Sequence, residues 1–241
     1  FNTEVTPVVN QILIDHNGFA GSVAVNNENT IFAATFTGTL YSLELNGNIL
    51  WQVETGNEFF GDLLIDSQDR IVAITLDGEV YWYTQQGELL QTMTPENKMQ
   101  VLSSAIIDKN DDIYLTSMRG GYGHVLAVSS EGEEKWFEQM GSVKYYHPPA
   151  FSSNETYIFF DDEIYDAETG EEFVYEVSFD ISTFVGGQDG KDYAIAGDTI
   201  AVMQIQPSGI SVAESGIVTS MLTRARGNVF VHPLEDGSIR L

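Results

Sequence analysis

Residues 22–55 read SVAVNNENTIFAATFTGTLYSLELNGNILWQVET, and this stretch contains one complete unit of a repeat. It begins with a small polar residue, Ser22, and continues as short runs of alternating apolar and polar residues that end at Gly38 or at Asn46-Gly47. Alternation with a period of two is typical of a half-buried β-strand, and Asn-Gly favours a tight hairpin. The stretch therefore predicts four consecutive antiparallel strands, at residues 22–25, 30–37, 39–45 and 48–55.

The same pattern recurs along the 241-residue chain, and its copies begin at Ser22, Asp62, Ser104, Pro149, Thr183 and Ser220. Successive copies are thus offset by 40, 42, 45, 34 and 37 residues. A period of about 40 residues made of short strands is typical of the four-stranded blade of a β-propeller, whereas a β-sandwich has no such fixed period. Helical periodicity of apolar residues is not sustained anywhere, so the predicted class is all-β.

The two ends of the chain carry complementary parts of a blade. The last copy ends at the strand Ser238–Leu241 with no fourth strand after it, while Val5–Asp15 precede the first copy. Because an open sheet edge is otherwise left unpaired, we expect the N-terminal strand to pair with the C-terminal blade. The prediction is a single domain over residues 1–241, a six-bladed β-propeller of four-stranded antiparallel blades closed by this pairing.

Composition excludes several classes of function. Asp and Glu number 36 against 10 Lys and Arg, which gives a net charge of −26 and a surface that repels phosphate backbones and anionic lipids. The best apolar stretch, Tyr193–Ile205, is interrupted by Asp198 and is shorter than the roughly 20 residues of a membrane-spanning helix. We therefore expect no nucleic-acid partner and no direct membrane insertion. Since the chain opens with Phe1 and shows no signal peptide, we interpret it as a processed or excised domain.

Two segments, Tyr41–Trp51 and Leu126–Trp136, carry a family resemblance. With Gly47 and Gly132 each four residues before a Trp, they resemble the repeat of pyrroloquinoline-quinone-like (PQQ-like) β-propellers. The resemblance implies that each Trp docks between neighbouring blades. That family contains quinoprotein dehydrogenases and non-enzymatic scaffolds such as outer-membrane assembly lipoproteins. The dehydrogenases resemble longer, eight-bladed rings, often with a vicinal disulfide, and this chain has no Cys.

The resemblance thus favours a divergent non-enzymatic member without a cofactor, located in the periplasm, outside the cell or at the cell surface. The predicted function is a binding or scaffold module for a protein or carbohydrate partner.

Aromatic and basic residues gather in the loops that follow the fourth strand and in those that join the second and third strands, which share one face of an antiparallel meander. Loops on a rigid scaffold are common recognition sites. We predict a basic-aromatic patch composed of Lys98, Arg119, Tyr122, Lys144, Tyr145, Tyr146 and His147. The alternative is structural: the cations neutralise nearby carboxylates and the Tyr rings cover blade cores.

Other groups of residues give weaker evidence for a metal site or a catalytic site. Asp108–Asp112 has the spacing of half a calcium loop but lacks its Gly and Glu, so turn formation explains these residues better and no metal site is predicted. Small residues such as Gly21 and Gly61 recur where the first strands converge on the axis, which predicts a packing role. No catalytic residues are predicted, and the enzyme alternative is a lyase or hydrolase acting at the central opening.

Overall fold

The structure of the protein is a computed structural model. It describes residues 18–101, 103–140, 149–160, 163–174, 183–187, 189–196, 199–206, 209–217, 232–233 and 239–240.

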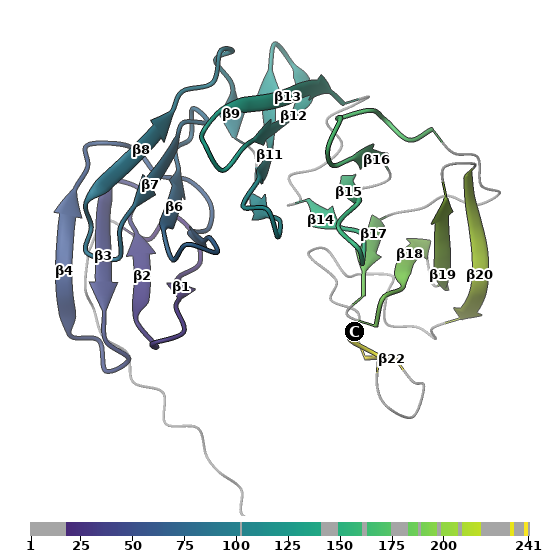
Figure 1. Cartoon of the computed structure of the whole chain (residues 1–241), viewed down its shortest axis with the longest axis horizontal. Helices are drawn as coiled ribbons and strands as arrows, with labels where there is room; N and C mark the ends of the chain where they lie inside the picture. The colour runs from purple at the N-terminus through teal and green to yellow at the C-terminus, as the bar shows by residue number, and fades with distance from the viewer. Residues whose placement is uncertain are drawn as a thin grey trace, which may run out of the picture.

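All regular elements in this part of the chain are β-strands, and they form antiparallel sheets in chain order (Figure 1). Blade 1 contains β1 (Ala24–Val25), β2 (Ile31–Ala34), β3 (Thr39–Leu43) and β4 (Ile49–Glu54). Blade 2 contains β5 (Leu64–Ile65), β6 (Ile71–Ile74), β7 (Val80–Tyr83) and β8 (Leu89–Met93). Blade 3 contains β9 (Gln100–Val101), β10 (Ile106–Ile107), β11 (Ile113–Arg119), β12 (Tyr122–Val128) and β13 (Glu134–Gln139).

The later sheets are described in part. Blade 4 contains β14 (Ala150–Phe151), β15 (Tyr157–Phe160) and β16 (Glu163–Asp166). Blade 5 contains β17 (Thr183–Gly186), β18 (Asp192–Ala196), β19 (Thr199–Gln206) and β20 (Gly209–Ile217). A last pair consists of β21 (His232–Pro233) and β22 (Ile239–Arg240). The blades follow one another around an arc, with the short first strands on its inner side (Figure 1).

One side-chain turn fixes the hairpin between the first and second strands in blades 1 to 3. Asn26 Oδ1 accepts the backbone N–H groups of residues 28 and 30, and Asp66 and Asp108 repeat this pair of hydrogen bonds in their own blades. The residue three places on has a positive φ in each case, at Asn29, Asp69 and Asp111. Asp and Asn stabilise such turns because their short side chains reach the backbone, which explains the carboxylate at position 108 without a metal.

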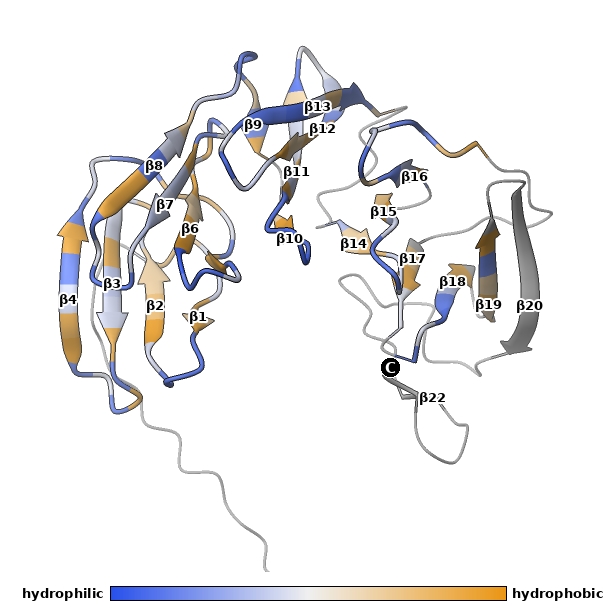
Figure 2. Cartoon of the chain, viewed as in Figure 1, coloured by the Kyte–Doolittle hydropathy of each residue, from blue (hydrophilic) through white to orange (hydrophobic). Residues whose placement is uncertain are grey.

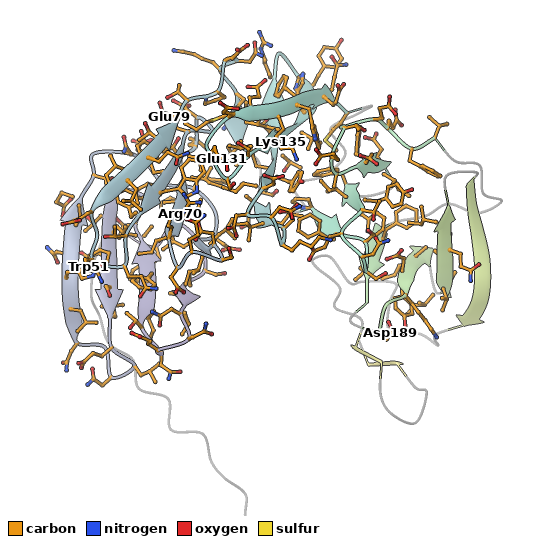
Figure 3. The ribbon with its side chains drawn as sticks, in the orientation of Figure 1. Trp51, Arg70, Glu79, Glu131, Lys135 and Asp189 are labelled. Carbon is orange, nitrogen blue, oxygen red and sulfur yellow. The ribbon has the colours of Figure 1, made fainter. Side chains whose placement is uncertain are left out.

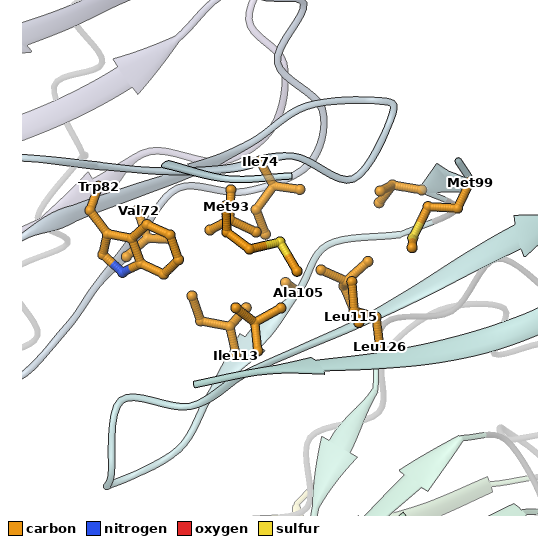
Figure 4. Close-up of a cluster of buried hydrophobic side chains, with 12 residues drawn as sticks. Val72, Ile74, Trp82, Met93, Met99, Ala105, Ile113, Leu115 and Leu126 are labelled. Atoms are coloured by element: carbon orange, nitrogen blue, oxygen red, sulfur yellow. The ribbon is translucent and has the colours of Figure 1, made fainter. Parts of the chain in front are cut away.

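Apolar residues fill the spaces between neighbouring sheets. Hydrophobic residues lie mainly in the strands and hydrophilic ones mainly in the turns (Figure 2). Between blades 2 and 3 the core includes the fully buried Trp82 together with Ile113 and Leu115 (Figure 4). Near the axis the packing is so close that a Cβ added at Gly21 would lie 2.1 Å from the carbonyl oxygen of Gly61. The small residues predicted there therefore have a packing role.

The predicted docking of tryptophan between blades is present at two junctions. The Trp51 indole Nε1 donates to the carbonyl oxygen of Gln85 in blade 2 at 2.8 Å, and Trp136 Nε1 donates to that of Ala167 in blade 4 at 3.1 Å. Each ring lies against the hairpin glycine of the next blade, Gly87 or Gly170, where an added Cβ would meet it. The hairpins therefore need glycine for two reasons: its positive φ, and the absence of a Cβ where the tryptophan ring packs.

Blade 2 reaches the same packing by exchanging two residues. Cross-strand partners between the third and fourth strands are Ser42 and Trp51 in blade 1 and Ala127 and Trp136 in blade 3, but Trp82 and Gln91 in blade 2. The tryptophan thus lies on the third strand instead of the fourth. Gln91 takes the fourth-strand position against Gly132, where a Cβ would lie 2.2 Å from its Nε2.

The all-β class and the four-stranded repeats of blades 1 and 2 are confirmed, with strand bounds within about three residues of those predicted for blade 1. The six-bladed closure stays a prediction. Its N-terminal strand, Val5–Asp15, lies outside the described residues, as does most of the last repeat.

Candidate functional site

The blade 3 hairpin brings together three residues of the predicted basic-aromatic patch. Arg119 and Tyr122 are cross-strand partners at the end of β11 and β12, joined by Gly120 and Gly121, whose φ values are both positive. This two-residue turn fits the right-handed twist of the strands. β9 pairs with β11 through Gln100 opposite Met118, so Lys98, two residues earlier, lies at the same end of the sheet.

The side chains of this group are available to a partner. Lys98 and Arg119 are exposed, and Tyr122 keeps 56% of its surface accessible. Among the ion pairs of the described residues, none involves either cation. No example of the structural alternative, in which these cations neutralise neighbouring carboxylates, is thus found at Lys98 or Arg119 among the described ion pairs, and both interpretations stay predictions. Lys144, Tyr145, Tyr146 and His147 lie outside the described residues.

On this face, two carboxylates of neighbouring blades each accept a hydrogen bond from a tyrosine of the same blade. The Tyr81 hydroxyl donates to Glu79 Oε2 at 2.8 Å, and the Tyr165 hydroxyl donates to Glu163 Oε2 at the same distance. Burial, reinforced by Glu79, raises the pKa of Tyr81 to about 12, so the hydroxyl stays a neutral donor. Glu79 is therefore oriented within its own blade.

His124 supports the hairpin beneath the patch. Its ring is buried and stacks on Phe137, with ring centroids 4.7 Å apart and an angle of 6° between the planes, and its Nδ1 lies 3.1 Å from the carbonyl oxygen of Tyr122. Burial lowers the pKa of His124, and the nearby positive charge of Arg119 lowers it further. The imidazole is thus held neutral as a structural group below Arg119 and Tyr122.

The opposite face carries the hairpins between first and second and between third and fourth strands, and we call it the hairpin face. At the junction of blades 2 and 3, Ser67 donates its backbone N–H and its hydroxyl to the two carboxylate oxygens of Asp111, both at 2.7 Å. Arg70 pairs with Asp66 and donates Nη2 to the carbonyl oxygen of Ser130 at 3.3 Å (Figure 3). Blades 2 and 3 are thereby joined by side chains of the chain itself.

The next junction is joined in a similar way by lysines. Lys135 Nζ lies 2.6 Å from Asp112 and 2.7 Å from Glu168 of blade 4 (Figure 3). Lys109 donates Nζ to the carbonyl oxygen of Asn154 at 3.3 Å, and its backbone N–H donates to Glu155. Cationic side chains therefore span both junctions of blade 3 on the hairpin face.

Blades 1 and 2 leave a pocket of about 420 Å³ between them on this face. The pocket is lined by Asn26, Asn27, Glu28, Gln68, Asp69, Arg70, Thr84, Gln85, Gln86 and Leu90. One hydrogen bond crosses it among the described residues, from Asn26 Nδ2 to Gln85 Oε1 at 2.9 Å. Sequence reasoning missed this pocket, because the turn residues that line it are individually ordinary.

Antiparallel blades in an arc, with tryptophans docked on the hairpins of the next blade, define a β-propeller repeat protein. The sequence profile of the family described as outer membrane protein assembly factor BamB matches residues 5–143, and the chain belongs to this PQQ-like repeat family. No curated protein matches the chain as a relative.

A solved structure shares the fold. It is the crystal structure of a functionally unknown protein from Desulfotomaculum acetoxidans, with a TM-score of 0.58, 16% sequence identity, and coverage of 89% of this chain and 74% of that one. In the described part of the chain, no helix is long and apolar enough to cross a membrane.

Proposed function

We propose that the protein is a non-catalytic binding or scaffold module of an exported assembly, and that it recognises a protein partner through the basic-aromatic patch. The observation that carries this proposal is the exposed group of Lys98, Arg119 and Tyr122 at the end of the five-stranded sheet of blade 3. Membership of a family described as an outer membrane protein assembly factor supports a role in protein interaction and a location in the cell envelope.

The electrostatics of the chain make this group distinctive. Ten basic residues are distributed over a chain of net charge −26, and Lys98 and Arg119 form no ion pair with the described residues. These two exposed cations create a local region that can attract an acidic surface. Tyr122 adds a large, rigid contact area at a low cost in conformational entropy. The proposed partner surface is therefore acidic, and such complementarity provides selectivity and rapid association.

The test compares two variants with equal loss of positive charge. The first carries Lys98→Ser and Arg119→Ser, and the control carries Lys109→Ser and Lys191→Ser, which removes two cations elsewhere. Partners are captured from a solubilised cell-envelope extract and quantified by mass spectrometry, and a glycan array is screened in parallel. We expect the first variant to keep its melting midpoint and lose a protein partner that the control retains.

Equal capture by both variants would overturn the proposal. Selective loss of glycan binding instead would show that the patch recognises carbohydrate.

A further inference from the structure

We infer that the pocket between blades 1 and 2 on the hairpin face binds an arginine side chain of a basic protein segment. This inference deepens the proposed function, on which it rests, by adding a second contact of opposite charge preference to the scaffold. The argument comes from comparing equivalent positions in consecutive blades.

The repeats supply an internal reference for what such a junction contains. Thr30, Arg70 and Asp112 are equivalent, because each donates its backbone N–H to the turn-forming side chain four residues earlier. In blade 2 the long Arg70 side chain crosses to blade 3 and places its guanidinium on a hairpin carbonyl oxygen. Thr30 is too short to make the corresponding connection to blade 2. Blade 2 thus contributes a guanidinium to its junction with blade 3, whereas blade 1 contributes none to its junction with blade 2.

The neighbouring position shows the same difference. Asn27, Ser67 and Lys109 each follow the turn-forming residue, and Ser67 and Lys109 both bond to the positive-φ residue of the next blade, Asp111 or Glu155. The equivalent pair here is Asn27 and Asp69, and no hydrogen bond between their side chains is found among the described residues. Among the described residues, the Asp69 carboxylate has no hydrogen bond and no ion pair, so it is available to a ligand.

The residues that line the pocket have the chemical groups to bind a guanidinium. Glu28 and Asp69 provide two carboxylates, while the charge of Arg70 is already paired with Asp66. The side-chain oxygens of Asn27, Gln68 and Gln86 add neutral acceptors, and the exposed Leu90 offers an apolar surface for the alkyl part of an arginine. A planar guanidinium with five donors matches carboxylate and amide oxygens better than an ammonium does.

The experiment uses the full chain and two nearly isosteric peptides that differ in the charge and hydrogen-bond donors of one side chain. An acetylated, amidated Gly-Gly-Arg-Gly-Gly peptide and its citrulline analogue are titrated into ¹⁵N-labelled protein, and side-chain amide resonances of Asn and Gln are followed by NMR. We expect the arginine peptide to shift the amides of Asn26, Asn27, Gln68, Gln85 and Gln86, with the citrulline peptide weaker by about tenfold or more.

Charge variants then locate the site. Glu28→Gln with Asp69→Asn should weaken the arginine peptide by about tenfold or more, whereas the matched control Glu131→Gln with Glu133→Gln, also on the hairpin face, should change affinity by about twofold at most. Equal weakening in both variants, equal shifts with citrulline, or shifts centred on other hairpins would overturn the inference.

These experiments distinguish failure of the pocket inference from failure of the proposed function. The Lys98→Ser and Arg119→Ser variant should bind the arginine peptide as the wild type does. Normal capture of an acidic partner without peptide binding in the pocket would remove this inference and leave the proposed function in place. If the peptide binds in the pocket but partner capture does not depend on Lys98 and Arg119, the proposed function fails and this inference stands.

Discussion

The exchanged tryptophan of blade 2 makes a quantitative prediction about inter-blade packing. Trp82 is fully buried, and Gln91, its cross-strand partner, fills the place that Trp51 and Trp136 take in their blades. Truncating a buried tryptophan to a small side chain costs about 3 to 5 kcal/mol, so Trp82→Ser should lose that much unfolding free energy. Gln91→Trp alone should cost about 1 to 3 kcal/mol, because Trp82 already occupies the space.

The double variant Trp82→Ser with Gln91→Trp restores the arrangement of blade 1, where Ser42 faces Trp51. Its new indole N–H can reach the carbonyl oxygen of Ser130, which corresponds to that of Gln85. We expect the double variant to lie within about 2 kcal/mol of the wild type, which requires a favourable coupling of about 2 kcal/mol or more. Urea denaturation followed by circular dichroism measures all four proteins of the cycle.

A matched control is the pair Trp136→Gln and Ala127→Trp, which imposes the blade 2 arrangement on blade 3 and should also couple favourably. Single-variant losses that add within about 0.5 kcal/mol would refute the reasoning, since the two positions would then act independently.

Three further outcomes are expected. Trp51→Ala should lower the unfolding free energy by about 3 to 5 kcal/mol in chemical denaturation, and a loss below about 1 kcal/mol would contradict its docking on blade 2. The melting midpoint should rise between dilute buffer and 0.5 M NaCl, because added ions screen the repulsion among 36 acidic residues, and an unchanged midpoint in calorimetry would argue against this. Because the pKa of His124 is lowered in the folded state, the unfolded chain binds the proton first as pH falls below about 6.5; stability should therefore decline there, and less so in His124→Gln, as measured by urea denaturation at stepwise pH.

The regular part of the fold could be predicted because local chemistry determines it. Asn26, Asp66 and Asp108 form their turns with backbone groups only two and four residues away, and the hairpin glycines supply a positive φ within their own loops. Such interactions are encoded at short range, so a single sequence displays them. The same holds for the tip of the blade 3 hairpin, where two adjacent glycines place Arg119 opposite Tyr122.

Interactions between blades were harder to predict. The fourth strand of blade 2 has Gln91 where blades 1 and 3 have a tryptophan, yet the packing is preserved because Trp82 on the third strand fills the same junction. The supporting role of His124 also depended on a stacking partner, Phe137, in another strand. Periodicity reports which side of a strand is buried, but it does not report which cross-strand partner carries the volume.

The pocket illustrates why departures from a repeat carry more information than the repeat itself. Most residues that line it are common turn residues, so inspection of one blade gives no signal. Alignment of turn-forming positions across blades does give one: an arginine at position 70 corresponds to Thr30, and a lysine at position 109 corresponds to Asn27. Cations of the chain itself join blade 3 to both of its neighbours. At the junction of blades 1 and 2 the corresponding acceptors are present, but blade 1 contributes no cation. In a scaffold built from repeats, the junction whose own side chains do not complete it is the place where a partner's side chain can do so.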